Sequence, residues 1–168
     1  KTFTNASDSA MVLGLYTATA TGFLGGAKKL DCDGLGWDAA EWAVFAAWLP
    51  RCGVCKTLDL RNNPMADAGA AALAEAAAQP GALPALKELR LSDNQIADAG
   101  LAALAEAAAK PGALPALEGL DLENNQIADA GLAGLAEAAA KPGALPALEL
   151  LYLDNNQIAD AGAGALAR

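Results

Sequence analysis

The sequence predicts an α/β solenoid, a curved horseshoe segment with parallel strands on its concave side and helices on its convex side. Two observations lead to this fold class. Residues 86–116 and 117–147 are copies of one 31-residue unit that differ at six positions. In each copy, a strand-like alternation of apolar and polar residues is followed by a helix-like pattern. A unit this short cannot bury its own apolar face, and it must therefore stack on further copies.

The first 54 residues show the unit only in degenerate form. Leu30 and Cys32 take the positions of the alternating leucines of later copies, but no asparagine follows them. Residues 38–49 supply a helix that contains alanine and tryptophan. The apolar run from Met11 to Gly26 is interpreted as a worn repeat helix, because it is shorter than the ~20 residues that span a bilayer. A membrane or targeting remnant and an irregular cap are the alternatives.

The unit is regular from residue 55 to residue 168, although its last copy is incomplete. We therefore predict a single domain over residues 1–168. Each unit should begin with a strand that has one buried face, because two leucines alternate with polar residues. In residues 86–116 these leucines are Leu89 and Leu91.

An asparagine ends each predicted strand. Its side chain can hydrogen-bond the backbone of a turn. Stacked copies are therefore expected to form a ladder along the solenoid. The ladder residues are Asn63, Asn94, Asn125 and Asn156.

A helix should follow the turn in each unit. Asp98 is predicted to be its N-cap, because aspartate accepts hydrogen bonds from free backbone N–H groups at a helix start. Leu101 and Leu104 share one face of this helix. Pro111 and Gly112 are predicted to end it.

The strand and turn of each unit follow the pattern LxxLxLxxNxI, as in Leu86, Leu89, Leu91, Asn94 and Ile96. This pattern resembles the leucine-rich repeat, and the long helix-bearing unit resembles the ribonuclease-inhibitor type of that family. The resemblance covers residues 55–168. It implies that the concave strand face is where partners bind.

Composition argues against several classes of function. The chain has a net charge of −9 and no histidine. Binding to nucleic acid or to anionic membranes needs clustered Lys and Arg, and histidine is the commonest general base and metal ligand. We therefore predict a non-enzymatic protein with no catalytic residue, no cofactor, no bound metal, no nucleic-acid partner and no direct membrane insertion.

The two central copies differ mainly in their strand segments, whose solvent-facing positions are predicted to bind a protein partner. The helix surface faces solvent as well, yet Glu106 and Lys110 recur unchanged in the next copy. Unconstrained drift is the alternative explanation of the changes. The predicted partner-binding residues are Lys56, Arg61, Lys87, Arg90, Glu118, Asp121, Glu123, Leu150, Tyr152 and Asp154.

Charge on this face changes along the chain. The first three strands mix cations with acids such as Asp59, whereas the last two carry only acids around Leu150 and Tyr152. An aromatic anchor rimmed by acids suits a partner with a basic surface. Asp121 and Glu123 form a carboxylate pair that could also hydrolyse glycosides or hold Ca²⁺. An open sheet, however, lacks the cleft that would push their pKa values apart.

Cys52 and Cys55 have the spacing of a redox or zinc motif. The repeat alignment places both, together with Cys32, at core positions, which favours buried thiols. A Cys52–Cys55 disulfide and metal or redox chemistry are the alternatives. Trp37 and Trp48, with a third tryptophan between them, are expected to cover the end of the core, or alternatively to contact another protein.

Two functions from different classes fit these observations. The first is a protein–protein interaction module, and the alternative is a structural accessory subunit held permanently in a larger assembly. Neither end shows a polar capping unit, and further repeats or another subunit are expected to cover both ends. The compartment stays open. The cytoplasm is favoured, with an organelle lumen as the alternative because the chain begins at Lys1 without Met.

Overall fold

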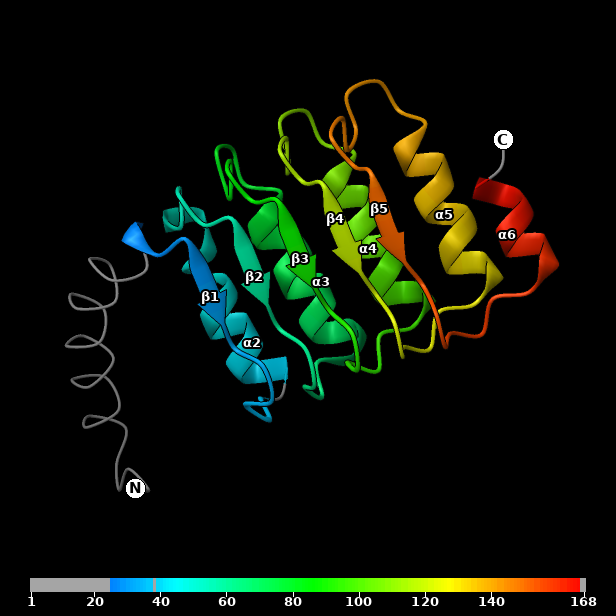
Figure 1. Cartoon of the computed structure of the whole chain (residues 1–168), viewed down its shortest axis with the longest axis horizontal. Helices are drawn as coiled ribbons and strands as arrows, with labels where there is room; N and C mark the ends of the chain where they lie inside the picture. The colour runs from blue at the N-terminus through cyan, green and yellow to red at the C-terminus, as the bar shows by residue number, and fades with distance from the viewer. Residues whose placement is uncertain (1–24, 38, 167–168) are drawn as a thin grey trace.

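The computed structural model describes residues 25–37 and 39–166 (Figure 1). Short strands alternate with helices throughout this part of the chain. In chain order the elements are β1 (Lys29–Asp31), α2 (Ala39–Ala46), the 3₁₀ helix η1 (Leu49–Arg51), β2 (Thr57–Asp59), α3 (Ala66–Ala77), β3 (Glu88–Arg90), α4 (Asp98–Ala108), β4 (Gly119–Asp121), α5 (Asp129–Ala139), β5 (Leu150–Tyr152) and α6 (Asp160–Leu166).

The strands form one parallel sheet in which every strand pairs with the next one along the chain. Their middle residues stand in register, and this row is Leu30, Leu58, Leu89, Leu120 and Leu151. Figure 1 shows the strands side by side in front of a layer of helices. The predicted α/β solenoid is thus confirmed. We call the side of the sheet that faces away from the helices the strand face.

The core lies between the sheet and the helices. Leu89 and Leu91 point into it, with exposed fractions of 3% and 0%, as their alternation with polar residues predicts. Leu30 and Cys32 fill the same two positions in the degenerate unit and are also buried. The repeat register therefore extends to β1, where the sequence pattern is weak.

The three cysteines are buried free thiols. Cys52 and Cys55 have no exposed surface, in agreement with their predicted core positions. Burial raises the pKa of the Cys32 and Cys52 thiols to about 11, and it raises the pKa of Cys55 as well. Because the reactive form of cysteine is the thiolate, these side chains act as small apolar residues. The structure has no Cys52–Cys55 disulfide.

Trp42 is a core residue, with 2% of its surface exposed. Its ring lies 4.9 Å from that of Trp37 and 5.6 Å from that of Phe45, between ring centroids. A Cβ atom added to Gly69 would lie 3.3 Å from the Trp42 ring, so α2 and α3 approach closely here. Trp48 is half-buried beneath the Arg51 guanidinium. Trp42 therefore fills the interface between α2 and α3.

The predicted N-cap role of Asp98 is wrong. Asp98 is the first residue of α4 and makes no capping bond to its own helix. Its Oδ1 instead accepts a hydrogen bond of 2.8 Å from the N–H of Ala128, which precedes α5. Asp67 bonds Ala97 and Gly100 in the same way, at 2.8 and 2.9 Å. Each aspartate thus caps the helix of the following unit.

The asparagines bridge neighbouring units from within the core. Asn94 Nδ2 donates to the carbonyls of Leu91 and Ser92 in its own turn and to that of Leu60 in the preceding unit. Equivalent bonds to the preceding unit are made by Asn63, Asn125 and Asn156. Turn and ladder contacts therefore come from the same amide group.

The run from Met11 to Gly26 is interpreted from its sequence as a worn repeat helix, with a membrane or targeting remnant as one alternative. Most of the run from Met11 to Gly26 lies outside the described residues. Among residues 25–37 and 39–166, no helix has the length and apolar character needed to cross a membrane.

Candidate functional site

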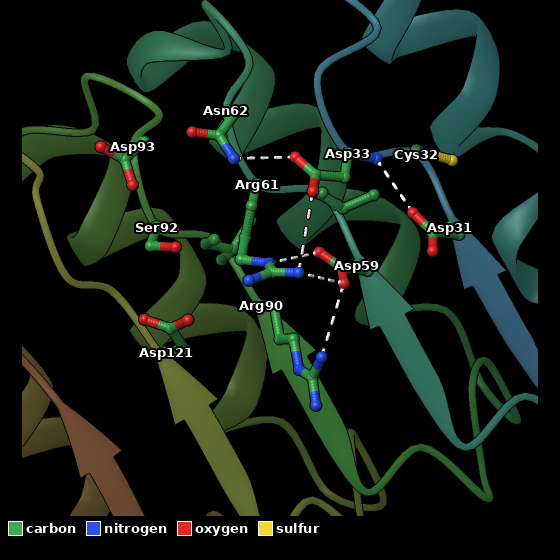
Figure 2. A network of polar contacts seen from close by, with 12 residues as sticks. Asp31, Cys32, Asp33, Asp59, Arg61, Asn62, Arg90, Ser92, Asp93 and Asp121 are labelled. Atoms are coloured by element: carbon green, nitrogen blue, oxygen red, sulfur yellow. Dashed lines mark hydrogen bonds and ion pairs between the residues drawn. The ribbon is translucent and has the colours of Figure 1, made fainter.

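The N-terminal half of the strand face is neutralised by its own ion pairs, which centre on Asp59 (Figure 2). Arg61 holds this carboxylate with two hydrogen bonds, Nε to Oδ1 at 2.7 Å and Nη2 to Oδ2 at 2.9 Å. Arg90 Nη1 lies 3.5 Å from Asp59 Oδ2 across the sheet. Such bidentate pairs are the strong form of arginine–carboxylate contact.

Asp59, one of the acids expected on this face, has no exposed surface. Burial alone would raise the pKa of its carboxyl group. Hydrogen bonds and positive charge from Arg61, with a smaller effect of Arg90, outweigh burial and hold the pKa of Asp59 below its ordinary value. The group stays ionised at neutral pH, covered by long arginine side chains that no strand pattern reveals.

Lys87 and Arg90 have further partners within the chain. Lys87 on the segment before β3 forms an ion pair with Glu118, which occupies the same position before β4. This contact raises the pKa of Lys87. Arg90 Nη2 donates a 2.6 Å hydrogen bond to Glu88 in its own strand. Glu118 is consequently less available to a partner than its charge suggests.

The acids around the C-terminal strands have no such counterions. Within the described ranges, no Lys or Arg lies within 4.0 Å of Asp121, Glu123 or Asp154. Partial burial raises the pKa of Glu123, and the neighbouring charges of Asp121 and Asp154 raise it further. Glu123 therefore neighbours Asp154 in a region of negative potential.

A hollow of about 310 Å³ opens on the strand face beside these acids. It forms at Gly119, where β4 carries no side chain between Glu88 of β3 and Leu150 of β5. A Cβ atom added to Gly119 would meet only the Glu88 side chain, at 4.0 Å. Leu150 and Tyr152 flank the hollow with 51% and 43% of their surface exposed. It therefore combines exposed apolar surface with negative charge.

The hollow brings together most of the residues predicted to bind a partner. Those in its lining are Arg90, Glu118, Asp121, Glu123, Leu150 and Tyr152. Those outside its lining are Lys56, Arg61, Lys87 and Asp154. The change from Glu88 to Gly119 between the two copies is the sequence signal for the hollow, because it removes a side chain between two large neighbours.

The site gives little support for acid–base or metal chemistry. Asp121 and Glu123 stand on an open sheet, and Asp121 Oδ1 accepts the backbone N–H of Glu123 at 3.1 Å. In the part of the chain that the structure describes, no group of three or more His, Cys, Asp or Glu residues could hold a metal ion. The arrangement is suited to binding a cation of a partner molecule.

Replacement of Glu123 by glutamine is expected to raise the melting temperature at pH 7. A carboxyl group whose folded pKa is raised opposes folding once it is ionised, so the wild-type protein loses stability as pH rises through that pKa. The advantage of Glu123→Gln should vanish below the ordinary glutamate pKa and shrink in high salt. Thermal unfolding at several pH values measures it. Glu137→Gln, at an exposed position of α5, is the control. An equal gain in melting temperature there would contradict relief of charge repulsion at Glu123 as the cause.

Two family models match the chain over its regular part. The model described as leucine-rich repeats (2 copies) matches residues 84–134. The model described as leucine-rich repeat matches residues 56–74 and 145–167. No curated protein matches the chain.

Proposed function

Because the chain is a leucine-rich-repeat protein, we propose that it binds a protein partner with a basic surface through its strand face and catalyses no reaction. Leucine-rich-repeat domains are generally protein-interaction modules and typically non-enzymatic. Each unit carries a full helix such as α4 or α5, which favours the ribonuclease-inhibitor-like type. A nucleic-acid partner is disfavoured by the net charge of −9.

The uneven charge balance of the strand face carries this proposal. Arg61 and Arg90 are tied to Asp59, whereas Asp121 and Glu123 form no ion pair within 4.0 Å among the described residues. A basic partner would relieve the repulsion that raises the pKa of Glu123. Exposed aromatic residues such as Tyr152 are frequent anchors of interfaces, and surrounding charges speed and orient the encounter.

The double variant Tyr152→Ala with Asp121→Lys is expected to weaken partner binding at least about tenfold without loss of fold. The first change removes the apolar anchor, and the second places a like charge opposite a basic surface. The partner is first obtained by co-purification from the native source, and its affinity for purified variants is then measured by calorimetry.

A matched pair of changes away from the strand face serves as the control. Val44→Ala with Glu137→Lys truncates one exposed apolar residue and reverses one exposed acid on the helices. This control should bind like the wild type. Full affinity of the folded strand-face variant, or equal loss in both variants, would overturn the proposed binding face.

A permanent accessory subunit is the second candidate. Leu151, Leu153 and Ile158 are only half-buried, whereas Leu120, Leu122 and Ile127 of the preceding unit are buried. Such apolar surface favours cover by further repeats or by another subunit. Size-exclusion chromatography of the isolated chain distinguishes the two candidates. A dedicated binder should stay monomeric and soluble alone. Aggregation that is prevented only by co-expressed partners would favour the permanent subunit.

A further inference from the structure

We propose that the hollow at Gly119 receives one arginine side chain of the partner protein, held between Asp121 and Tyr152. This inference rests on the proposed function and specifies its contact chemistry. Its strongest support comes from the chain itself, because the same sheet already holds arginines at an equivalent carboxylate.

Asp59 and Asp121 occupy the same position in their units. Asp59 pairs in the sheet with Arg90 of the next strand, and Asp121 pairs with Tyr152 of the next strand. Two residues further on, Asp59 is followed by Arg61, which binds it with two hydrogen bonds. The residue at that position after Asp121 is Glu123. Both arginines that surround Asp59 are therefore replaced at Asp121, by an acid and an aromatic residue.

Figure 2 shows the contrast between the two carboxylates. Dashed lines join Asp59 to the guanidinium groups of Arg61 and Arg90, whereas none joins Asp121 to either arginine, although Asp121 pairs with Arg90 in the sheet. Asp121 is half-exposed and Asp59 is fully buried. An arginine from outside would give Asp121 the kind of partner that Asp59 has within the chain.

The surroundings of Asp121 fit arginine better than lysine. The planar guanidinium can bind a carboxylate through two parallel donors while it lies flat on an aromatic ring, whereas a lysine ammonium is a compact point charge without that planar fork. Tyr152 supplies the ring, and exposed Leu150 can contact the aliphatic part of the side chain. The hollow of about 310 Å³ lies at the lower end of the roughly 300–1,000 Å³ of ligand pockets, as suits a single side chain.

Titration of the isotope-labelled 168-residue chain with N-acetyl-arginine-N-methylamide tests the site by NMR. Saturable shifts are expected for the backbone amides of Gly119, Asp121 and Tyr152. The lysine analogue should bind more weakly, and the neutral isostere citrulline should cause no saturable shift. Absence of a saturable shift with arginine, or equal shifts with lysine or with citrulline, would overturn the assignment of a guanidinium site.

Two variants test the geometry. Gly119→Leu fills the hollow with the side chain that Leu150 carries in the same register, at unchanged net charge, and should weaken arginine binding about tenfold. Gly134→Leu, at an open position of α5, is the matched control and should leave binding unchanged. Glu123→Arg restores the arrangement of Arg61, and it should abolish binding of the probe while raising the melting temperature.

The outcomes separate this inference from the function on which it rests. If the Gly119→Leu variant binds arginine as the wild type does, the hollow is not the arginine site. If the partner still depends on Tyr152 and Asp121 in that case, the proposed function stands and only the arginine site is wrong. If partner binding is indifferent to those residues while arginine still binds, the strand-face function is wrong.

Discussion

Replacement of Asn125 by alanine is expected to lower the free energy of unfolding by about 3–5 kcal/mol, because several buried backbone groups lose their partners at once. Asn125 Oδ1 accepts hydrogen bonds from the N–H groups of Asn94 and Ile96, at 3.2 and 2.9 Å. Its Nδ2 donates to three carbonyls, those of Leu91, Leu122 and Glu123. Five backbone groups of two neighbouring units therefore depend on this one side chain.

Denaturant unfolding followed by circular dichroism measures the loss. Asn125→Asp keeps the shape but turns the donor into an acceptor facing three carbonyls, and it should be at least as destabilising at pH 7. Gln126→Ala, at the exposed neighbouring position, is the control and should change stability by less than about 0.5 kcal/mol. A loss below about 1 kcal/mol for Asn125→Ala would contradict a central role for the asparagine contacts.

Gly100→Ala is expected to destabilise the fold by about 1–3 kcal/mol, although alanine is the better helix former. The added Cβ atom would lie 2.6 Å from Asp67 Oδ1 and 2.9 Å from Ile96 Cγ2. The carboxylate would have to leave the N–H groups of Ala97 and Gly100 that it now caps. Asp67→Ala alone should cost about 1–2 kcal/mol for the same lost cap.

A double-mutant cycle tests whether one contact underlies both effects. Since the alanine at Gly100 displaces the carboxylate that Asp67→Ala removes, the double variant should lose less stability than the sum of the single variants, by about 1 kcal/mol. Gly134→Ala is the control, because its position in α5 is open, and it should be neutral or stabilising. Additive losses would show that Asp67 and Gly100 act independently.

The repeat register was predictable because a strand has a side-chain period of two and the copies are nearly identical. Once Leu91 is placed in the core, Leu89 must point to the same side of the sheet. Alignment of the units gives Leu30 the position of Leu89, so Leu30 is predicted to be buried as well. Stacking then determines the sheet order, since each unit can pair only with its neighbours. Core positions therefore follow from spacing.

Contacts between units were not predictable in the same way. Asp98 stands at a helix start, where the local pattern indicates an N-cap, but its carboxylate faces the following helix in space. Sequence spacing cannot distinguish a cap within a unit from one across the boundary, because both place aspartate at the same position. The glycine at position 131 in α5 was the available clue to this contact, because a Cβ atom there would lie 2.5 Å from Asp98 Oδ1.

The candidate site was predictable as a face but not as a shape. Alternation places Asp59 and Asp121 on the same side of the sheet, yet one is buried and the other half-exposed. The difference arises from the long side chains of Arg61 and Arg90, whose directions depend on neighbours in two other strands. The hollow likewise depends on what lies beside Gly119, which a single strand does not reveal.

The forward reach of each aspartate has a consequence for how this chain can change in length. Asp67 contacts a residue 30 positions ahead, and so do Asp98 and Asp129. Loss or gain of one whole unit rejoins equivalent residues and restores every such contact, whereas a shift by a single residue breaks all of them beyond the junction. Recombination between units therefore preserves the fold while it rearranges the side chains on the strand face. A new order of charges and anchors can thus arise in one genetic step, without passing through an unfolded intermediate sequence.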